Sequence, residues 1–313
     1  MTGYHRPSTL AGVLDLLTTH GAQTQLLAGG TALLLPDRRH LIGEHLLALR
    51  DIPELHGVRL DASGTLHLGA LSTHTALSSS PLVHRFCPAL GAAFARIANV
   101  RVRNQASLGG NLALADPAHD PPAILIALNA RALLAHSVGA GTSATREVDV
   151  QDLADGPGSS TLAPEEILVH VRIPPTAGLR VVHHKFLVRA GSFRDQASYP
   201  TVSVGVALTL DTHQRCTQLR IGLSGVHPYP CRATATEAAL LGQRVTPTAI
   251  HDAAASVRGD LDPADDERGT PGYKRDMAAV WIERALTEAV ALPPLPTPPH
   301  PTWMPGPEEG GDG

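Results

Sequence analysis

Residues 26–34 read LLAGGTALL, an apolar run interrupted by two consecutive glycines and a threonine. This pattern predicts a buried strand, a tight turn, and then the start of a helix. Consecutive glycine N–H groups before a helix could bind a pyrophosphate through backbone donors and the helix dipole. A tight turn between strand and helix, without any ligand, explains the same residues equally well.

The flanks of this stretch predict a small α/β unit. Four apolar residues before it recur at the spacing of one helix face: Leu10, Val13, Leu14 and Leu17. Gly21 stands where that helix would end. Residues 46–49, LLAL, predict a second short buried strand. We therefore expect residues 1–55 to form a first subdomain with parallel strands.

The hydrophobic period changes after residue 56. Residues 58–60 and 66–68 alternate between apolar and polar side chains on either side of a turn, which predicts an antiparallel hairpin. Further on, Pro121-Pro122 opens an apolar run that is typical of a helix start. We expect residues 56–175 to form a second α/β subdomain, which ends at Pro174-Pro175.

A second glycine element lies within this subdomain. Residues 103–111 read RNQASLGGN and are followed by ADP at residues 115–117. Two glycine elements in one chain favour a phosphate-bearing cofactor over two unrelated turns. Residues 139–144, GAGTSA, also fit a dinucleotide-binding pattern, but the alternation after them predicts a hairpin loop instead.

The last third of the chain combines strands and helices. Three β-rich runs predict a three-stranded sheet, and three helical stretches follow them, so residues 176–291 are expected to form a C-terminal sheet-plus-helix domain. The runs span residues 181–188, 202–210 and 219–226, and the helical stretches span residues 234–241, 247–257 and 272–291. Residues 292–313 contain eight prolines, which predicts a polyproline-like or disordered tail.

Composition excludes several classes of function. The formal net charge of −4 argues against nucleic-acid binding. Three cysteines far apart argue against a disulfide framework and against an iron–sulfur or zinc site, and the 17 histidines show no metal-binding pattern, so we expect no metal. No apolar run approaches the ~20 residues that span a bilayer, and the N-terminus lacks a secretory pattern, so we expect a cytoplasmic protein.

Lysine is rare in this sequence. The chain contains Lys185 and Lys274 against 23 arginines. Lys185 lies in a predicted strand, where a compact cation could stabilise a reduced, anionic cofactor. A composition biased toward arginine would explain the same count without any function.

Four segments together resemble the FAD-binding, or medium, subunit of the molybdenum hydroxylases, the family of xanthine dehydrogenase and carbon monoxide dehydrogenase. They are LLAGGTALL, RNQASLGGNLALADPAHDPPAILIALNA, TLAPEEILVHVRIP and HHKF, and the resemblance runs over roughly residues 2–290. It implies an α+β chain with a fold like that of vanillyl-alcohol oxidase. Two α/β subdomains would enclose FAD, and the C-terminal domain would follow them.

The resemblance also implies which residues bind FAD. Two segments would wrap the pyrophosphate: Leu27, Ala28, Gly29, Gly30, Thr31, Ala32 and Leu33, and Ser107, Leu108, Gly109, Gly110 and Asn111. Six more positions would contact the cofactor or line its cleft: Ile97, Asp116, Asp120, Leu168, Lys185 and Tyr199. The sequence departs from the family pattern at Ala106-Ser107, where Gly-Thr is usual, and at Ala32, where many members have an acid or amide. Residues 191–198 are longer than in the commonest version.

The implied function is electron transfer within a complex. A large subunit would oxidise substrate at a molybdenum cofactor, a small subunit would carry a 2Fe–2S cluster, and FAD on this chain would pass the electrons to an external acceptor. By resemblance, the assembly would be a dimer of heterotrimers. No catalytic residue is expected on this chain, and FAD is its only expected redox centre. Two alternatives remain: a free-standing flavin oxidoreductase, and an assembly platform that has lost its flavin.

Overall fold

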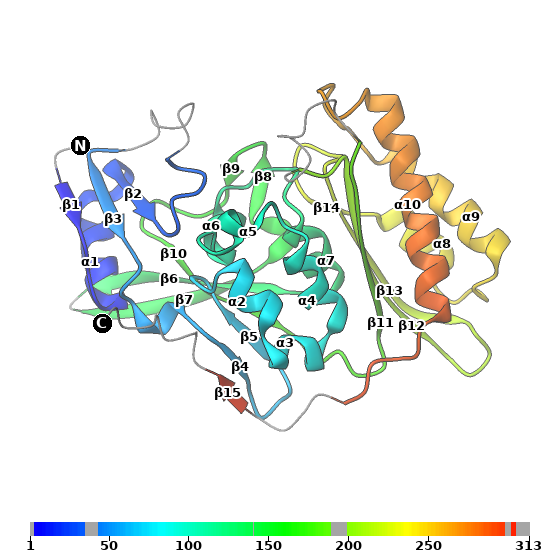
Figure 1. The fold of residues 1–313 in the computed structure, drawn as a ribbon, viewed down its shortest axis with the longest axis horizontal. Helices are drawn as coiled ribbons and strands as arrows, with labels where there is room; N and C mark the ends of the chain where they lie inside the picture. Colours follow the sequence, from blue (N-terminus) through cyan, green and yellow to red (C-terminus); the bar gives the residue numbers. More distant parts are fainter. Residues whose placement is uncertain (1–2, 35–42, 140, 189–198, 298–301, 305–313) are drawn as a thin grey trace.

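The computed structural model describes residues 3–34, 43–139, 141–188, 199–297 and 302–304. Three larger sheets follow one another along the long axis of the molecule, and helices pack on each of them (Figure 1). The first sheet is parallel, and the other two are antiparallel. The chain is therefore α+β, as the sequence predicted.

The first sheet has the order β1-β3-β2 and is covered by one helix. Its elements are β1 (Gly3–His5), α1 (Leu10–His20), β2 (Thr24–Leu27) and β3 (His45–Ala48), with a short 3-10 turn at Gly21–Gln23. The hydroxyl of Thr9 caps α1 by accepting from the N–H of Gly12. Val13, Leu14 and Leu17 are the buried face of α1, as predicted, and they pack with apolar residues of β3.

The glycine pair after β2 leads into a turn. Residues 31–34 form this turn, which is closed by a 3.0 Å hydrogen bond from the N–H of Leu34 to the carbonyl of Gly30. The sequence predicted the start of a helix here. Within the described residues the chain makes only a turn, and residues 35–42 lie outside them.

The second sheet has six strands in the order β15-β4-β5-β10-β6-β7. Five of these come from the middle of the chain: β4 (Val58–Leu60), β5 (Leu66–Gly69), β6 (Arg131–Gly139), β7 (Thr142–Asp149) and β10 (Ile167–Ile173). Strands β4 and β5 form the predicted hairpin. Strands β6 and β7 form another hairpin, in which the first strand ends at Gly139 and the second begins at Thr142, so the GAGTSA stretch belongs to a hairpin rather than to a strand–helix turn, as expected.

Six short helices pack beside this sheet. They are α2 (His74–Ser79), α3 (Pro81–Phe86), α4 (Pro88–Ala95), α5 (Val100–Arg103), α6 (Leu108–Ala113) and α7 (Pro121–Ala127). Their apolar side chains, which include Phe86 and Phe94, form one buried cluster with strands β4, β5, β6 and β10. Short 3-10 turns occur at Pro53–Leu55 and Val150–Asp152, and β8 (Ala154–Gly156) pairs with β9 (Ser159–Ser160).

The third sheet has four strands in the order β11-β12-β13-β14. They are β11 (Arg180–Phe186), β12 (Val202–Leu210), β13 (Cys216–Ser224) and β14 (Cys231–Arg232). The three long strands match the predicted runs, but the expected three-stranded sheet has a fourth, two-residue strand, which is too short to give a periodic signal. The predicted helices are α8 (Thr234–Leu240), α9 (Pro247–Ser256) and α10 (Pro271–Ala291), with a 3-10 turn at Val257–Gly259.

The described part of the proline-rich tail is ordered against the rest of the molecule, contrary to expectation. The backbone of Leu295 hydrogen-bonds to Leu179 and Gly178, and its side chain packs against the central core. Strand β15 (Thr302–Met304) pairs antiparallel with β4. Short stretches between prolines keep their N–H groups, so they can pair with an exposed strand edge even where a longer element cannot form.

Helix α7 packs closely against one face of the third sheet, and α10 packs against the other (Figure 1). Gly205 of β12 lies opposite Gly222 of β13. A Cβ at these positions would lie 2.5 and 2.1 Å from the carbonyl oxygen of Ala123 in α7. The two glycines therefore permit the close contact that sets Asp120, at the start of α7, beside β11.

Candidate flavin site

The two glycine segments lie in contact with each other. A Cβ at Gly29 would lie 1.7 Å from the carbonyl oxygen of Gln105, so the bare backbone of the first segment touches the residues just before the second. A Cβ at Gly110 would lie 3.8 Å from the Cβ of Ala28. The segments 27–33 and 107–111 therefore lie side by side, although more than 70 residues separate them in the sequence.

Residues 70–74 hold the second segment in place. The N–H of Gly109 donates to Ala70 O at 2.7 Å and that of Leu108 to Ser72 O at 3.1 Å, while the N–H of His74 donates to Ala106 O at 3.1 Å. A Cβ at Gly109 would lie 2.8 Å from that of Ala70. Gly109 is thus required for packing, whereas Gly110 is exposed.

Ser107 and Asn111 supply the polar groups of this segment. The hydroxyl of Ser107 caps α6 by accepting from the N–H of Gly110 at 3.2 Å, so the serine that replaces the usual threonine keeps a capping role. The side-chain oxygen of Asn111 is buried and has no hydrogen-bond partner within the described residues. A buried acceptor in this state favours a ligand that brings a donor.

Asp120 and Lys185 form a buried ion pair. The Nζ of Lys185 lies 2.6 Å from Oδ2 of Asp120, and these side chains are 5% and 3% exposed. Lys185 also donates to the carbonyl of Arg96 at 3.1 Å, next to Ile97. Burial raises the pKa of Asp120 to about 6, although the charge and hydrogen bond of Lys185 oppose that rise. The structure thus brings two predicted residues together, Asp120 and Lys185, and Lys185 reaches the residue before Ile97.

The predicted residues Asp116, Tyr199 and Leu168 make other contacts. Oδ1 of Asp116 accepts from the N–H of Ala118, which orders the turn before α7. The ring of Tyr199 lies nearly parallel to that of His119, with centroids 5.8 Å apart. Leu168 of β10 is buried in the same hydrophobic cluster as Ile97 and Leu108. Residues 191–198, which the sequence marks as a longer loop, lie outside the described residues.

Sequence reasoning missed two residues that connect these parts. His119 hydrogen-bonds through its ring to the carbonyl of Asn111 and stacks on Tyr199. The guanidinium of Arg268 lies 5.8 Å from the centre of the same tyrosine ring. His119 stands inside the quoted ADPAHD stretch, so its position was a signal, whereas Arg268 comes from the distant C-terminal region and carries no local pattern.

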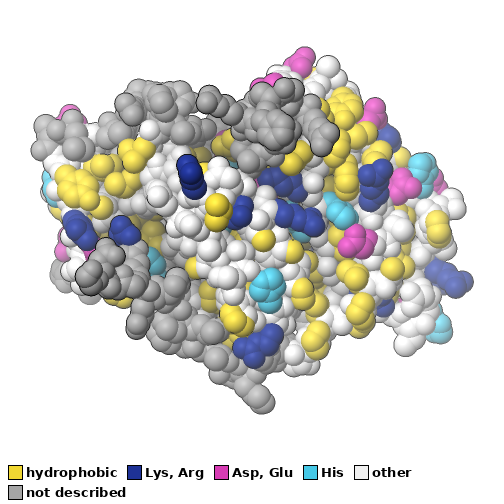
Figure 2. All heavy atoms as spheres, viewed as in Figure 1, with side chains coloured by type: hydrophobic (Ala, Val, Ile, Leu, Met, Phe, Trp, Pro, Cys, Tyr) yellow, Lys and Arg dark blue, Asp and Glu magenta, His cyan; other side chains and the backbone are white. Residues whose placement is uncertain are grey.

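Basic side chains gather in the central part of one face, over the region of α5 in Figure 1 (Figure 2). Helix α5 carries Arg101 and Arg103 in its last turn. The guanidinium of Arg103 donates to the carbonyls of Ile97 and Ala98 at 2.7 and 3.0 Å. Local positive charge on a chain of net charge −4 suits an anionic pyrophosphate.

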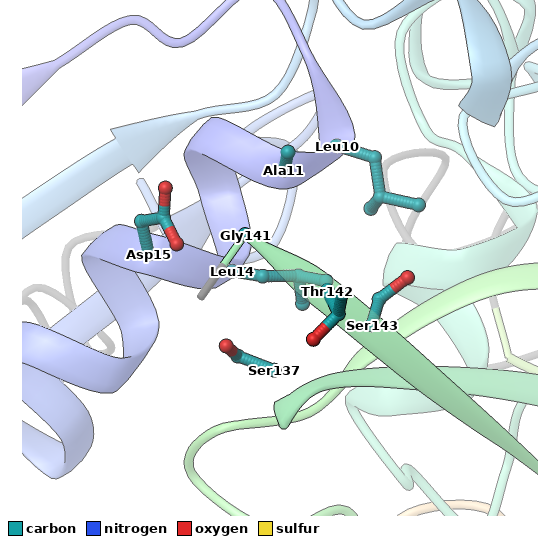
Figure 3. Close-up of a pocket in the computed structure, with 8 residues that line it drawn as sticks. All are labelled: Leu10, Ala11, Leu14, Asp15, Ser137, Gly141, Thr142 and Ser143. Carbon is teal, nitrogen blue, oxygen red and sulfur yellow. The ribbon is translucent and has the colours of Figure 1, made fainter. Parts of the chain in front are cut away.

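A separate small cavity lies between α1 and the β6–β7 hairpin (Figure 3). Its volume is about 90 Å³, and residues such as Leu14, Asp15 and Ser137 line it. None of its lining residues is a predicted site residue, and it is much smaller than the ~300 Å³ or more of typical cofactor pockets. This cavity is therefore not the flavin site.

The residues at the glycine segments fit FAD. Side chains at Gly29 and Gly109 would fill the space that the close backbone contacts require. The buried side-chain oxygen of Asn111, which has no hydrogen-bond partner within the described residues, lies on a segment that the resemblance assigns to the cofactor. A polar ligand that presents both donors and phosphate oxygens matches this set of groups.

Comparison with known families identifies the chain. Residues 1–176 match the FAD binding domain in molybdopterin dehydrogenase. The chain belongs to this family. Residues 190–289 also match the CO dehydrogenase flavoprotein C-terminal domain.

Individual relatives agree with this assignment along nearly the whole chain. A carbon monoxide dehydrogenase medium chain from Hydrogenophaga pseudoflava is 32% identical over 291 residues, which cover 92% of this chain and 96% of that protein. A xanthine dehydrogenase FAD-binding subunit from Escherichia coli is 28% identical over 291 residues, with the same two coverages. A solved carbon monoxide dehydrogenase from H. pseudoflava, which lacks the Mo-pyranopterin moiety of its cofactor, superposes with a TM-score of 0.84 at 34% identity, covering 92% of this chain and 97% of that one.

These matches confirm four predictions: the molybdenum-hydroxylase family, FAD as the cofactor, an oxidoreductase subunit, and the role of an FAD-binding subunit. Relatives that are named as medium chains or subunits also imply further subunits. Among the described residues, no helix is long and apolar enough to cross a membrane.

Proposed function

We propose that residues 27–33 and 107–111 jointly hold the pyrophosphate of FAD. The contact between Gly29 and Gln105, with Ala28 facing Gly110, is the observation that carries this proposal. Backbone N–H groups of both segments would neutralise phosphate charge, supported by the basic residues of α5. When bound, FAD supplies the reversible electron transfer that no side chain of this chain can perform.

The other predicted residues would orient the rest of the cofactor. We place Ile97, Asp116, Asp120, Leu168 and Tyr199 around the cofactor, and Lys185 joins Asp120 to the backbone of Arg96. Because Lys185 is paired with a carboxylate, we propose that it acts together with Asp120 rather than as an isolated cation. The pair would hold α7, β11 and the segment around Ile97 in fixed positions beside the cofactor.

The finer description of the fold belongs to the same proposal. We assign residues 1–55 and 56–175 to two subdomains that enclose FAD in the manner of vanillyl-alcohol oxidase. Residues 176–291 form the C-terminal domain, which reaches the site through Lys185 and Tyr199. Each of these three units contains one of the three larger sheets, to the second of which β15 adds a further strand.

Within the complex, the chain would relay electrons. FAD would receive them from a 2Fe–2S cluster on a small subunit after a large subunit oxidises substrate at a molybdenum cofactor, and an external acceptor would take them. The H. pseudoflava relative is named a medium chain, and the superposed structure is described through its molybdenum cofactor, which supports this division of labour. We propose a dimer of heterotrimers in the cytoplasm.

The test uses Gly110→Leu in the full chain, co-expressed with its partner subunits. The purified wild-type protein should show flavin absorbance at about 450 nm, and the cofactor released from it should be FAD. Leu at the exposed position 110 would project toward Ala28 and should lower FAD content at least about 10-fold, since it occupies the space between the two segments. Gly259→Leu, at an exposed glycine with open space around it, is the matched control and should keep its FAD.

Three other outcomes would contradict parts of the proposal. A Gly110→Leu variant with full FAD content would remove the second segment from the site. Wild type that stays colourless within the complex would instead support the assembly platform. Substrate oxidation by the chain alone, without partner subunits, would support the free-standing flavin oxidoreductase.

A further inference from the structure

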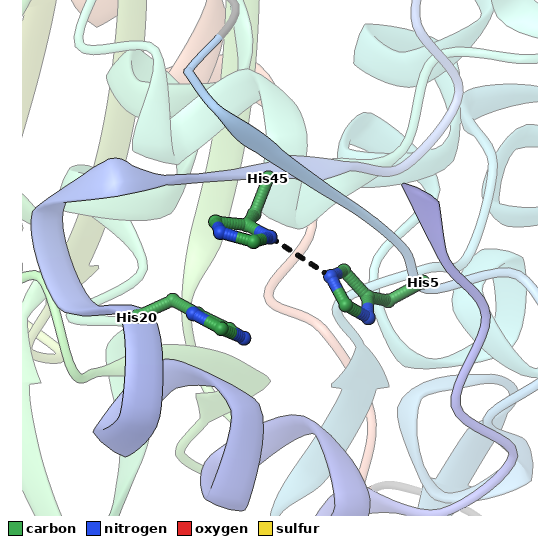
Figure 4. A group of neighbouring side chains, drawn as sticks. All are labelled: His5, His20 and His45. Atoms are coloured by element: carbon green, nitrogen blue, oxygen red, sulfur yellow. Dashed lines mark hydrogen bonds between the residues drawn. The ribbon is translucent and has the colours of Figure 1, made fainter. Parts of the chain in front are cut away.

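Three histidines from different elements converge at one end of the first sheet (Figure 4). His5 ends β1, His20 ends α1, and His45 begins β3. One ring nitrogen of each lies within 4.8 Å of those of the other two. The closest pair, Nε2 of His5 and Nδ1 of His45, is 3.0 Å apart, and the rings of His20 and His45 stack with centroids 3.8 Å apart.

The backbone around this cluster is shaped to admit it. Gly3 pairs with His45 in the parallel ladder between β1 and β3, and it shares a strand face with His5. A Cβ at Gly3 would lie 2.6 Å from Nδ1 of His45 and 2.7 Å from Nε2 of His5. The two imidazoles can meet only because position 3 has no side chain.

The surroundings of the cluster favour a cation. The carboxylate residue Glu44 directly precedes His45 in the chain. A neutral imidazole is the form that binds metals. His20 lies in the last turn of α1, where the free carbonyls of the helix end carry partial negative charge.

We propose that His5, His20 and His45 bind one divalent transition-metal ion of the zinc type, with an open position for water. Imidazole nitrogens suit Zn²⁺, Ni²⁺ and Cu²⁺. A Zn–N distance of about 2.05 Å in a tetrahedral site places ligand nitrogens about 3.3 Å apart, close to the 3.0 Å between His5 and His45. The ion would replace the proton shared by that pair, and rotation of the His20 ring would complete the set.

This site is distinct from the flavin site and has a structural consequence. The ion would join β1, α1 and β3 at one end of the parallel sheet whose strand β2 leads into the first glycine segment. No spacing motif in the sequence indicates this cluster, because the three histidines follow one another at intervals of 15 and 25 residues. A stack of histidines that binds no metal is the competing interpretation.

The test measures Zn²⁺ binding to the tag-free full chain after removal of metals with a chelator. Calorimetry should find one saturable Zn²⁺ per chain, and His5→Ala, His20→Ala and His45→Ala should each weaken binding at least about 10-fold to 100-fold. His251→Ala is the matched control, since that exposed histidine lies outside the cluster and pairs with Glu283. Gly3→Val keeps all three ligands and should also lose the ion, because its side chain fills the space between the rings.

Two results would overturn the proposal. One is wild type without saturable, one-to-one binding; the other is a triple histidine variant that binds Zn²⁺ as tightly as wild type. If the variants fail to fold, Co²⁺ added to wild type decides the matter. A visible spectrum of nitrogen-coordinated Co²⁺ that Zn²⁺ abolishes supports the site, and the absence of that spectrum refutes it.

Discussion

The buried ion pair makes a quantitative prediction for Lys185→Met. In wild type the pKa of Asp120 is about 6, against about 3.9 for an aspartate in the unfolded chain. Between these values the folded state binds more protons than the unfolded state, so stability falls as pH rises toward 6 and is then constant. Between these two pKa values the free energy of unfolding falls by about 3 kcal/mol, since each pH unit contributes about 1.4 kcal/mol.

Removing the lysine extends that loss to higher pH. Asp120 is 3% exposed, and without its counter-charge it should stay protonated to about pH 9, as buried carboxyls without partners do. At pH 5 the free energy of unfolding of the variant should therefore be only about 1 kcal/mol lower than that of wild type, because the carbonyl of Arg96 loses its hydrogen bond from the lysine. Beyond this difference, the free energy of unfolding of the variant should be lower than that of wild type by about 1 kcal/mol at pH 7 and by about 4 kcal/mol at pH 9.

Denaturant unfolding of flavin-stripped chains at pH 5, 7 and 9 measures these differences. The double variant Asp120→Asn, Lys185→Met is the control, because with no carboxyl at position 120 it should lose the pH-dependent part. A Lys185→Met loss that is the same at pH 5 and pH 9 would show that Asp120 does not need the lysine charge, and the electrostatic account of this pair would be wrong.

Three further predictions concern stability. Gly205→Ala should destabilise the chain by about 1–3 kcal/mol in chemical unfolding, because its Cβ would lie 2.5 Å from a carbonyl oxygen of α7. Burial lowers the pKa of His74 to about 3, and neither ring nitrogen has a hydrogen-bond partner within the described residues. Because the folded state disfavours the protonated ring, the free energy of unfolding falls as pH drops below about 6.5. His74→Phe removes this loss and should raise the melting temperature at pH 5. Deletion of residues 292–313 should cost about 1–3 kcal/mol, since it removes the packing of Leu295 and the pairing of β15 with β4, and an unchanged melting temperature would contradict this.

The elements that sequence reasoning found are those with a local physical cause. Gly21 ends α1 because glycine adopts the positive φ of 48° that this position has, and Pro121 starts α7 because its missing N–H has no partner at a helix start. Strands β14 and β15 have two and three residues, too few for any period. They form because a neighbouring strand has an unpaired edge, and this depends on the tertiary structure rather than on the local sequence.

The site follows the same division. The two glycine segments could be selected because consecutive glycines suit close backbone approach, and the resemblance assigned both to one cofactor. Their contact through Gly29 and Gln105 depends on how β2 and residues 70–74 are placed, which no spacing encodes. The histidine cluster is the extreme case, because each of its three members is unremarkable in its own segment.

Lys185 shows why residue type alone does not decide a role. As a single cation in a strand, it suggested direct stabilisation of a reduced cofactor. At 2.6 Å from a carboxylate, with both groups almost fully buried, its attraction to Asp120 is about 6 kcal/mol at an effective dielectric constant of 20. Any effect on the flavin must therefore come from the pair, whose net charge is close to zero when Asp120 is ionised and positive when it is protonated. Because the pKa of Asp120 is about 6, the net charge of this pair changes around pH 6. The charge of an isolated lysine would be constant there.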